Sequence, residues 1–181
     1  MRALRFDAGS LSLNLVATVG RRFGEPIERL TSVERLREWL AGVGLDPVSA
    51  SNAGDLTQIR QLRETLHLLF RATLAGERPA TSALDEVNAI VASGVPQLVA
   101  TRAGVRLSSP TIEPVLALIA ADAIRIVAGS ARDDLRACAA PDCRMLYLAR
   151  GRHARRWCSS EHCGNRSRVA AHRARESGGT R

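Results

Sequence analysis

Five segments of the chain repeat apolar residues every three or four positions, which is the spacing of one buried helix face. The segments begin at Leu11, Val33, Asp55, Ser82 and Pro110, and they end near Val19, Gly42 or Gly44, Gly76, Gly94 and Val127. Local signals agree, because Ser10 is a favourable N-cap and Thr31-Ser32-Val33-Glu34 has the pattern of a capping box. The chain up to residue 131 is therefore predicted to be a mainly helical module.

The period changes between residues 97 and 108, where we expect a β-hairpin. Residues 97–101 and 105–108 are rich in apolar and β-branched side chains, and Arg102-Ala103-Gly104 lies between them. Gly104 can adopt the positive φ that a tight hairpin turn requires. The predicted fold class of this module is therefore mainly α with one small β-hairpin.

All four cysteines of the chain follow this module, at Cys138, Cys143, Cys158 and Cys163. Two C-x4-C pairs separated by fourteen residues can each offer two thiolates to one metal ion. Four thiolates in a tetrahedron suit Zn²⁺, which has no geometric preference of its own. The sequence therefore predicts one structural Zn²⁺ per chain, held by these four ligands, with no open coordination position for catalysis.

Two disulfides, or four buried thiols without a metal, are the alternative interpretations. Disulfides need an oxidising compartment, and the sequence has neither a clear secretion signal nor an apolar run near 18 residues. We therefore expect a cytoplasmic protein that does not span a membrane. Structural core cysteines would be scattered along the chain rather than confined to its last third, which favours zinc.

The cysteine-rich segment is predicted to form a treble-clef-like unit of knuckle, hairpin and helix. Residues 145–148 are expected to form a short strand, residues 150–156 a basic hairpin tip, and residues 163–175 a helix with Val169 and Ala170 facing inward. The expected domains are the helical module 1–131, the zinc finger 132–176 and a flexible tail 177–181.

Two motifs in this segment resemble a known family. Arg155-Arg156-Trp157-Cys158 and Cys163-Gly164-Asn165-Arg166 resemble the CGNR-type zinc finger of bacterial proteins. That family carries an N-terminal ABATE domain, and its members are described as putative stress-induced transcription regulators. The resemblance thus implies an ABATE domain over residues 1–131. The chain departs from the family pattern at residues 147–151, where relatives have a Phe-x-Asp-x-Ser-like run, and at residues 13–18, where they have Leu-Asp-Phe-x-Asn-Thr.

The net charge of +8 is unevenly placed along the chain. Residues 1–131 carry 14 arginines and 13 acidic residues, whereas residues 132–181 carry 12 arginines and 5 acidic residues. The positive charge therefore belongs mainly to the cysteine-rich segment. It favours an anionic partner, with double-stranded DNA as the first candidate and a solvated basic tail as the alternative.

Side chains that can contact nucleic acid lie on both sides of the second cysteine pair. Asn165 offers the donor and acceptor that adenine readout requires, and arginine suits guanine or phosphate. A structural role for Asn165, bonding the turn or the thiolates, is the alternative. The candidates are Arg152, Arg155, Arg156, Asn165, Arg166, Arg168 and Arg173.

The first 131 residues contain no recognisable catalytic arrangement, so an enzyme is not expected. Asn14 and Thr18 are candidates for contacting a small molecule, with hydrogen bonds inside the helix as the alternative. Asp122, near an apolar stripe, is either a ligand-contacting carboxylate or a solvated boundary residue. The expected function is a DNA-binding transcription regulator whose N-terminal module senses a small-molecule or protein signal. The alternative function is a zinc-finger protein-interaction module without DNA binding.

Overall fold

The computed structural model of the chain describes residues 3–45, 51–93, 98–102, 104–107, 111–149 and 155–178. Its α-helices are α1 (Leu11–Val16), α2 (Val33–Gly42), α3 (Ala53–Ala75), α4 (Thr81–Ala92), α5 (Glu113–Ala128) and α6 (Asn165–Gly178). A 3-10 helix spans Ser130–Asp134 and a π-helical turn spans Ser160–Gly164. The antiparallel strand pairs are β1 (Val19–Gly20) with β2 (Ile27–Glu28), β3 (Leu98–Thr101) with β4 (Gly104–Leu107), and β5 (Leu135–Ala137) with β6 (Leu146–Leu148). The predicted class, mainly α with a C-terminal four-cysteine unit, is confirmed.

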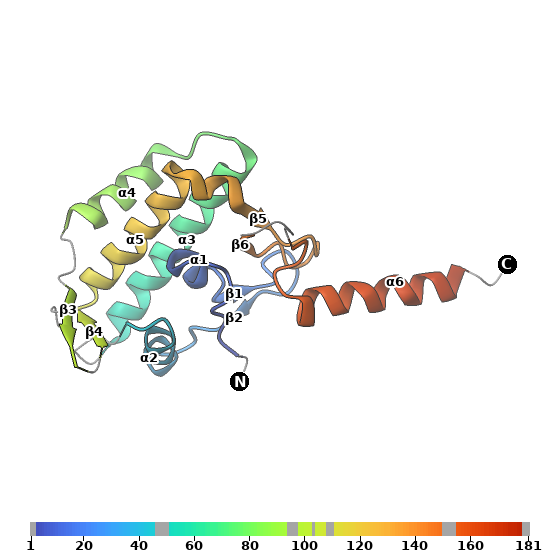
Figure 1. The fold of residues 1–181 in the computed structure, drawn as a ribbon, viewed down its shortest axis with the longest axis horizontal. Helices are drawn as coiled ribbons and strands as arrows, with labels where there is room; N and C mark the ends of the chain where they lie inside the picture. Colours follow the sequence, from blue (N-terminus) through green and yellow to red (C-terminus); the bar gives the residue numbers. More distant parts are fainter. Residues whose placement is uncertain are drawn as a thin grey trace.

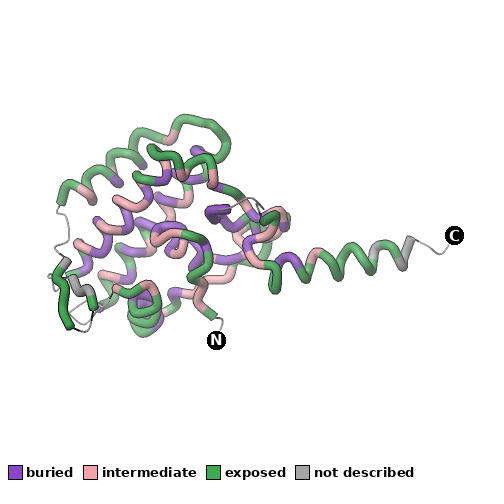
Figure 2. The backbone as a smooth tube through the Cα atoms, in the orientation of Figure 1, coloured by how far each residue is buried: buried purple, intermediate pink, exposed green. Residues whose placement is uncertain are grey.

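Helices α3, α4 and α5 pack side by side, and α1 lies against α3 and α5 (Figure 1). The apolar stripes of these helices face inward, as the purple stretches in Figure 2 show. Fully buried side chains include Leu13 of α1, Leu66 and Phe70 of α3, Ile119 of α5 and Trp39 of α2. Each such side chain stabilises the fold by about 1.5–3 kcal/mol when buried. The apolar side chains that recur every three or four positions in the sequence therefore form the core of the module.

The helix ends follow local side-chain chemistry. Ser10 caps α1, and Gly76 ends α3 in the left-handed conformation with a φ of 72°, both as predicted. Ser32 is the residue that caps α2. Asn52 starts α3 earlier than predicted, because its side chain accepts hydrogen bonds from two N–H groups of the first turn. Ser82 lies inside α4, which begins without a side-chain cap.

The β3–β4 hairpin is confirmed, with Thr101 paired to Gly104 and a φ of 123° at Gly104. The β1–β2 pair was not predicted, because strands of two residues are too short to show an alternating pattern. Arg21 follows β1 directly and has a positive φ of 51°, which starts the turn between the two strands. Predicted boundaries at Gly94, Gln97, Ser108 and Pro110 lie outside the described residues.

The finger and the helical module share one hydrophobic core. The predicted strand 145–148 is observed as β6, but its partner is β5, which precedes the first cysteine. The N–H of Leu148 donates to the carbonyl of Ala8 at 2.8 Å, so β6 is also joined to the start of the chain. Tyr147 is buried between these parts, with 1% of its surface exposed. The segment before α1 therefore packs against the finger as well as the helices.

Helix α6 extends away from the rest of the described chain (Figure 1). The expectation that Val169 and Ala170 face inward is wrong, because both are exposed and Val169 keeps 42% of its surface. The helix runs to Gly178, so residues 177 and 178 are helical, and residues 179–181 lie outside the described part. Among the described helices, none combines the length and apolar character needed to cross a bilayer.

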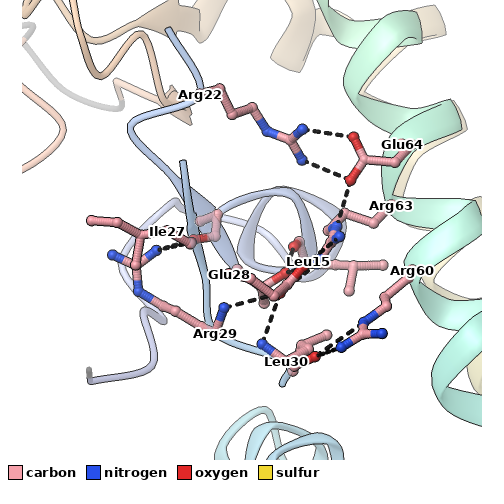
Figure 3. A network of polar contacts seen from close by, with 11 residues as sticks. Leu15, Arg22, Ile27, Glu28, Arg29, Leu30, Arg60, Arg63 and Glu64 are labelled. Carbon is pink, nitrogen blue, oxygen red and sulfur yellow. Dashed lines mark hydrogen bonds and ion pairs between the residues drawn. The ribbon is translucent and has the colours of Figure 1, made fainter. Parts of the chain in front are cut away.

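An ion-pair network joins α3 to the β1–β2 hairpin (Figure 3). Arg63, with only 5% of its side chain exposed, donates to Glu28 at 2.8 Å and to the hydroxyl of Thr18 at 3.1 Å. Its Nε donates to Glu64 at 2.7 Å, and Arg22 donates to the same carboxylate at 2.6 Å. A buried guanidinium group needs such partners, so this network fixes the position of the hairpin.

Candidate metal centre and basic surface

The four cysteines come together as predicted, from the end of β5, the turn before β6, and the segment before α6. All four are buried, and their sulfur atoms lie within 4.8 Å of one another. The Cys143–Cys158 and Cys158–Cys163 sulfur pairs are 3.8 and 3.6 Å apart. A tetrahedral zinc site with Zn–S bonds of about 2.3 Å has S–S edges of about 3.8 Å, whereas a disulfide bond is about 2.05 Å long. The donor set and its spacing therefore fit a zinc ion and not a disulfide.

Local backbone geometry brings each pair to the metal position. In the first knuckle, the Cys143 N–H donates to the carbonyl of Ala140 at 3.0 Å, and Arg144 follows with a positive φ of 48°. In the second, the Gly164 N–H donates to the carbonyl of Ser159 at 2.9 Å. A Cβ on Gly164 would lie 3.1 Å from the ring of Trp157, so glycine allows this ring to pack against the knuckle.

The thiols of the sulfur cluster ionise interdependently, because hydrogen bonds with Cys143, then with Cys158, lower the pKa of the Cys138 thiol well below its usual range. Burial, followed by the charge of Cys143, raises the pKa of the Cys163 thiol to about 12. Hydrogen bonds with Cys138, then with Cys143, raise the pKa of the Cys158 thiol well above its usual range. Metal ligands are thiolates, so metal binding here has to release protons, and its free energy is coupled to folding of the knuckles.

Two arginines donate to the sulfurs of the candidate centre. Arg5 Nη1 lies 3.7 Å from the sulfur of Cys158, and its Nη2 donates to the carbonyl of the same residue at 3.2 Å. Arg166 Nη2 lies 3.6 Å from the sulfur of Cys163. Zn²⁺ with four thiolates carries a net charge of −2, which these guanidinium groups would offset. Sequence reasoning missed Arg5, since it lies far from the cysteines along the chain and has no motif around it.

Two of the predicted nucleic-acid residues before the second knuckle, Arg155 and Arg156, have partners within the fold. Arg155 donates to the carbonyl of Asp7 at 2.7 Å and lies 4.5 Å above the ring of Tyr147. Arg156 is exposed and lies 5.0 Å above the ring of Trp157. Arg152 lies outside the described residues. Of this group, Arg156 is the described side chain most open to a phosphate.

The other predicted nucleic-acid residues, Asn165, Arg166, Arg168 and Arg173, are exposed on α6. Arg166 donates to the carboxylate of Asp142 at 2.9 Å and to the sulfur of Cys163, so it has a structural role. At 100° per residue, Arg173 shares the face of Arg166, whereas Arg168 and Arg175 lie on the opposite face. The basic groups of α6 therefore surround the helix.

The polar residues predicted to contact a ligand are engaged inside the module. Asn14 accepts from the N–H of Ala8 at 3.0 Å. Thr18 is fully buried, donates to the carbonyl of Leu15 at 2.7 Å and accepts from Arg63. Asp122 accepts from the backbone N–H of Ser12 at 2.8 Å and from its hydroxyl, which ties α5 to α1. All three side chains thus support the packing of α1.

The fold and the site define a class of protein: a helical module joined to a four-cysteine finger. Residues 9–130 match the family model of ABATE, described as "Putative stress-induced transcription regulator", and residues 135–176 match that of the CGNR zinc finger. The first match covers more than half of the chain, so the chain belongs to the ABATE family and carries a CGNR zinc finger. No curated protein matches the chain at a significant level.

Proposed function

We propose that this chain is a cytoplasmic, DNA-binding transcription regulator, in which one structural Zn²⁺ positions α6 on double-stranded DNA. The observation that carries the proposal is the projection of α6, with exposed arginines around it, away from the shared core (Figure 1). A major groove about 12 Å wide admits one α-helix. Four thiolates fill the coordination sphere of zinc, so the metal has a structural and not a catalytic role.

The proposal assigns different tasks to the basic residues. Arg168 and Arg173 are exposed on α6, and they are assigned to bases or phosphates inside the groove. Asn165, at the first position of α6, is assigned to the groove edge. Arg156, beside Trp157, is assigned to a phosphate of the flanking backbone. Arg166 is assigned mainly to the sulfur cluster, because both Cys163 and Asp142 already accept its donors.

The test is the binding of the zinc-loaded full chain to a fluorescein-labelled duplex, measured by anisotropy over a salt series. Two double variants are compared. The test variant carries Arg168→Gln and Arg173→Gln on α6. The control variant carries Arg71→Gln and Arg78→Gln on the helical module. Both pairs remove two positive charges. Each lost phosphate contact should reduce the slope of log K against log salt by about 0.9, so the α6 variant should lose up to about 2 from the slope.

Two results would contradict the proposal. Equal loss of affinity in both double variants would mean that net charge, and not α6, attracts the duplex. Undetectable binding of the unaltered chain at low salt would leave the finger as a protein-interaction module. A reduced slope in the α6 variant alone supports DNA binding through this helix, and selection of preferred sequences from a random pool would then identify the operator.

A further inference from the structure

A groove of about 770 Å³ lies where the finger meets the start of the chain. One wall is formed by residues 3–5 and the β1–β2 hairpin, and the other by both knuckles and the base of α6. This volume is in the range of about 300–1,000 Å³ that small-molecule sites occupy. A molecule bound in this groove would contact both the helical module and the finger.

One side of the groove is apolar. Leu4 and Ile27 line it from the module, and Met145 and Val169 line it from the finger. Val169, the one large apolar residue of α6, keeps 42% of its surface exposed. This exposed apolar surface supplies contact area for an apolar ligand in the groove.

The polar side of the groove gathers guanidinium groups around one carboxylate. Asp142 accepts from Arg21 of the hairpin turn at 3.0 Å and from Arg166 of α6 at 2.9 Å. Of the five N–H donors of Arg21, only that on Nε has a hydrogen-bond partner among the described residues. Its side chain keeps 35% of its surface exposed. The terminal nitrogens of Arg21 therefore can bind a second carboxylate or another planar anion in bidentate fashion.

Arginines are the most numerous charged side chains in the lining of the groove. Arg5, Arg21, Arg29 and Arg166 line the groove, against Glu161 as its one acidic lining residue among those described. Asp7 and Asp142 lie beside the groove and pair with Arg5, and with Arg21 and Arg166, respectively. Arg5 and Arg166 also contact the sulfurs of the cysteine cluster, whose negative charge with zinc they offset, so the open terminal nitrogens of Arg21 are the contact available to an incoming anion.

We infer that this groove binds a small organic anion with an apolar body, whose acidic group contacts Arg21 and whose body lies on Ile27, Met145 and Val169. The site extends the proposed function, because its occupant would contact the finger at the base of the DNA-binding helix. Binding of the ligand itself does not require DNA, so it can be tested separately from the proposed function.

The probe is 8-anilinonaphthalene-1-sulfonate, which combines apolar rings with one sulfonate and fluoresces on leaving water. The zinc-loaded full chain is titrated without DNA, and octanoate and 1-octanol are then compared as competitors. Arg21→Gln removes the anion contact and Val169→Asp places a negative charge on the apolar wall. Arg78→Gln, on the loop between α3 and α4, removes one positive charge outside the groove and is the matched control for Arg21→Gln.

The expected result is saturable binding that Arg21→Gln weakens by about tenfold or more, the usual effect of losing one charge-assisted hydrogen bond, and that Val169→Asp also weakens. Arg78→Gln should leave the dissociation constant unchanged, and octanoate should displace the probe at concentrations where 1-octanol does not. Asp142→Asn, checked for full zinc content, should tighten binding because it removes the internal competitor for Arg21.

Three results would overturn the inference: equal weakening by Arg21→Gln and Arg78→Gln, equal competition by octanoate and 1-octanol, or no saturable binding of the probe. None of these depends on DNA affinity. Binding of DNA without binding of the probe would refute the groove alone, whereas binding of the probe without binding of DNA would refute the proposed function alone.

Discussion

Arg5 donates to the sulfur of Cys158 across 3.7 Å, although 153 positions separate the two residues in the chain. Asp7 holds the guanidinium in place with a 2.7 Å ion pair, and 11% of the Arg5 side chain is exposed. The candidate metal centre is therefore completed by a residue from outside the finger. Side chains that contact the metal-coordinating residues in this way tune the affinity for the metal.

Arg5→Gln should weaken zinc binding about tenfold, the lower end of the range for residues that orient metal ligands. The physical reason is the loss of a positive charge beside four thiolates. The measurement is competition for zinc between the protein and a chromophoric chelator. Arg132→Gln, an exposed arginine on the 3-10 helix, is the control and should match the unaltered protein. Equal zinc affinity in all three proteins would remove Arg5 from the centre.

Cys163→Ser should abolish stoichiometric zinc binding, since three thiolates and a neutral hydroxyl form a much poorer site. The metal content is measured by mass spectrometry after gel filtration. Helices α3 to α5 should persist in the circular dichroism spectrum, because their buried faces contact one another. The finger should become sensitive to protease. Retained zinc together with unchanged protease resistance would show that Cys163 is not one of its ligands.

Arg63→Gln should lower the free energy of unfolding by about 2–3 kcal/mol. Removing one partner of a buried ion pair typically costs about 3–5 kcal/mol, and the partial exposure of Glu28 and Glu64, at 33% and 47%, reduces the loss. The measurement is urea denaturation at pH 7. Arg71→Gln, which loses only a stacking contact with the exposed ring of Phe23, should cost less than about 1 kcal/mol. Similar losses in both variants would contradict a special role for the network.

His67 should make the fold less stable in weak acid. Burial, followed by the charge of Arg22, lowers its pKa to about 4, and its Nδ1 is buried without a hydrogen-bond partner among the described residues. The unfolded chain binds a proton at His67 below pH about 6.5 and the folded chain only near pH 4, so falling pH favours the unfolded state. From pH 7 to pH 5 the loss is at most about 2 kcal/mol.

The comparison that isolates His67 is between His67→Gln and His172→Gln, each measured by urea denaturation at pH 7 and pH 5. Zinc release in acid affects all the proteins alike, so the difference between variants is informative. His67→Gln should lose up to about 2 kcal/mol of the pH dependence, whereas His172→Gln, on the exposed helix α6, should retain it. An unchanged pH dependence in His67→Gln would show that this histidine already titrates normally in the fold.

Helix positions and metal ligands were predictable from the sequence because both depend on short spacings. The stripe of Leu66 and Phe70 repeats within two turns, and each cysteine pair is closed by one turn. The partners of β6 were not predictable, because Leu148 bonds to Ala8 across the whole module. Val169 was placed wrongly, since helical spacing gives the face of a residue but not whether another element covers it.

The contact between Ala8 and Leu148 joins residues that a ribosome makes 140 positions apart. The ribosome adds roughly 5–20 residues per second. Leu148 is therefore synthesised on the order of ten seconds after Ala8. The final placement of the first segment then also depends on the last two cysteines, which are made later still. With the proposed zinc site, the supply of metal to the newly made chain would therefore set when Arg5 and Asp7 complete their contacts with the finger.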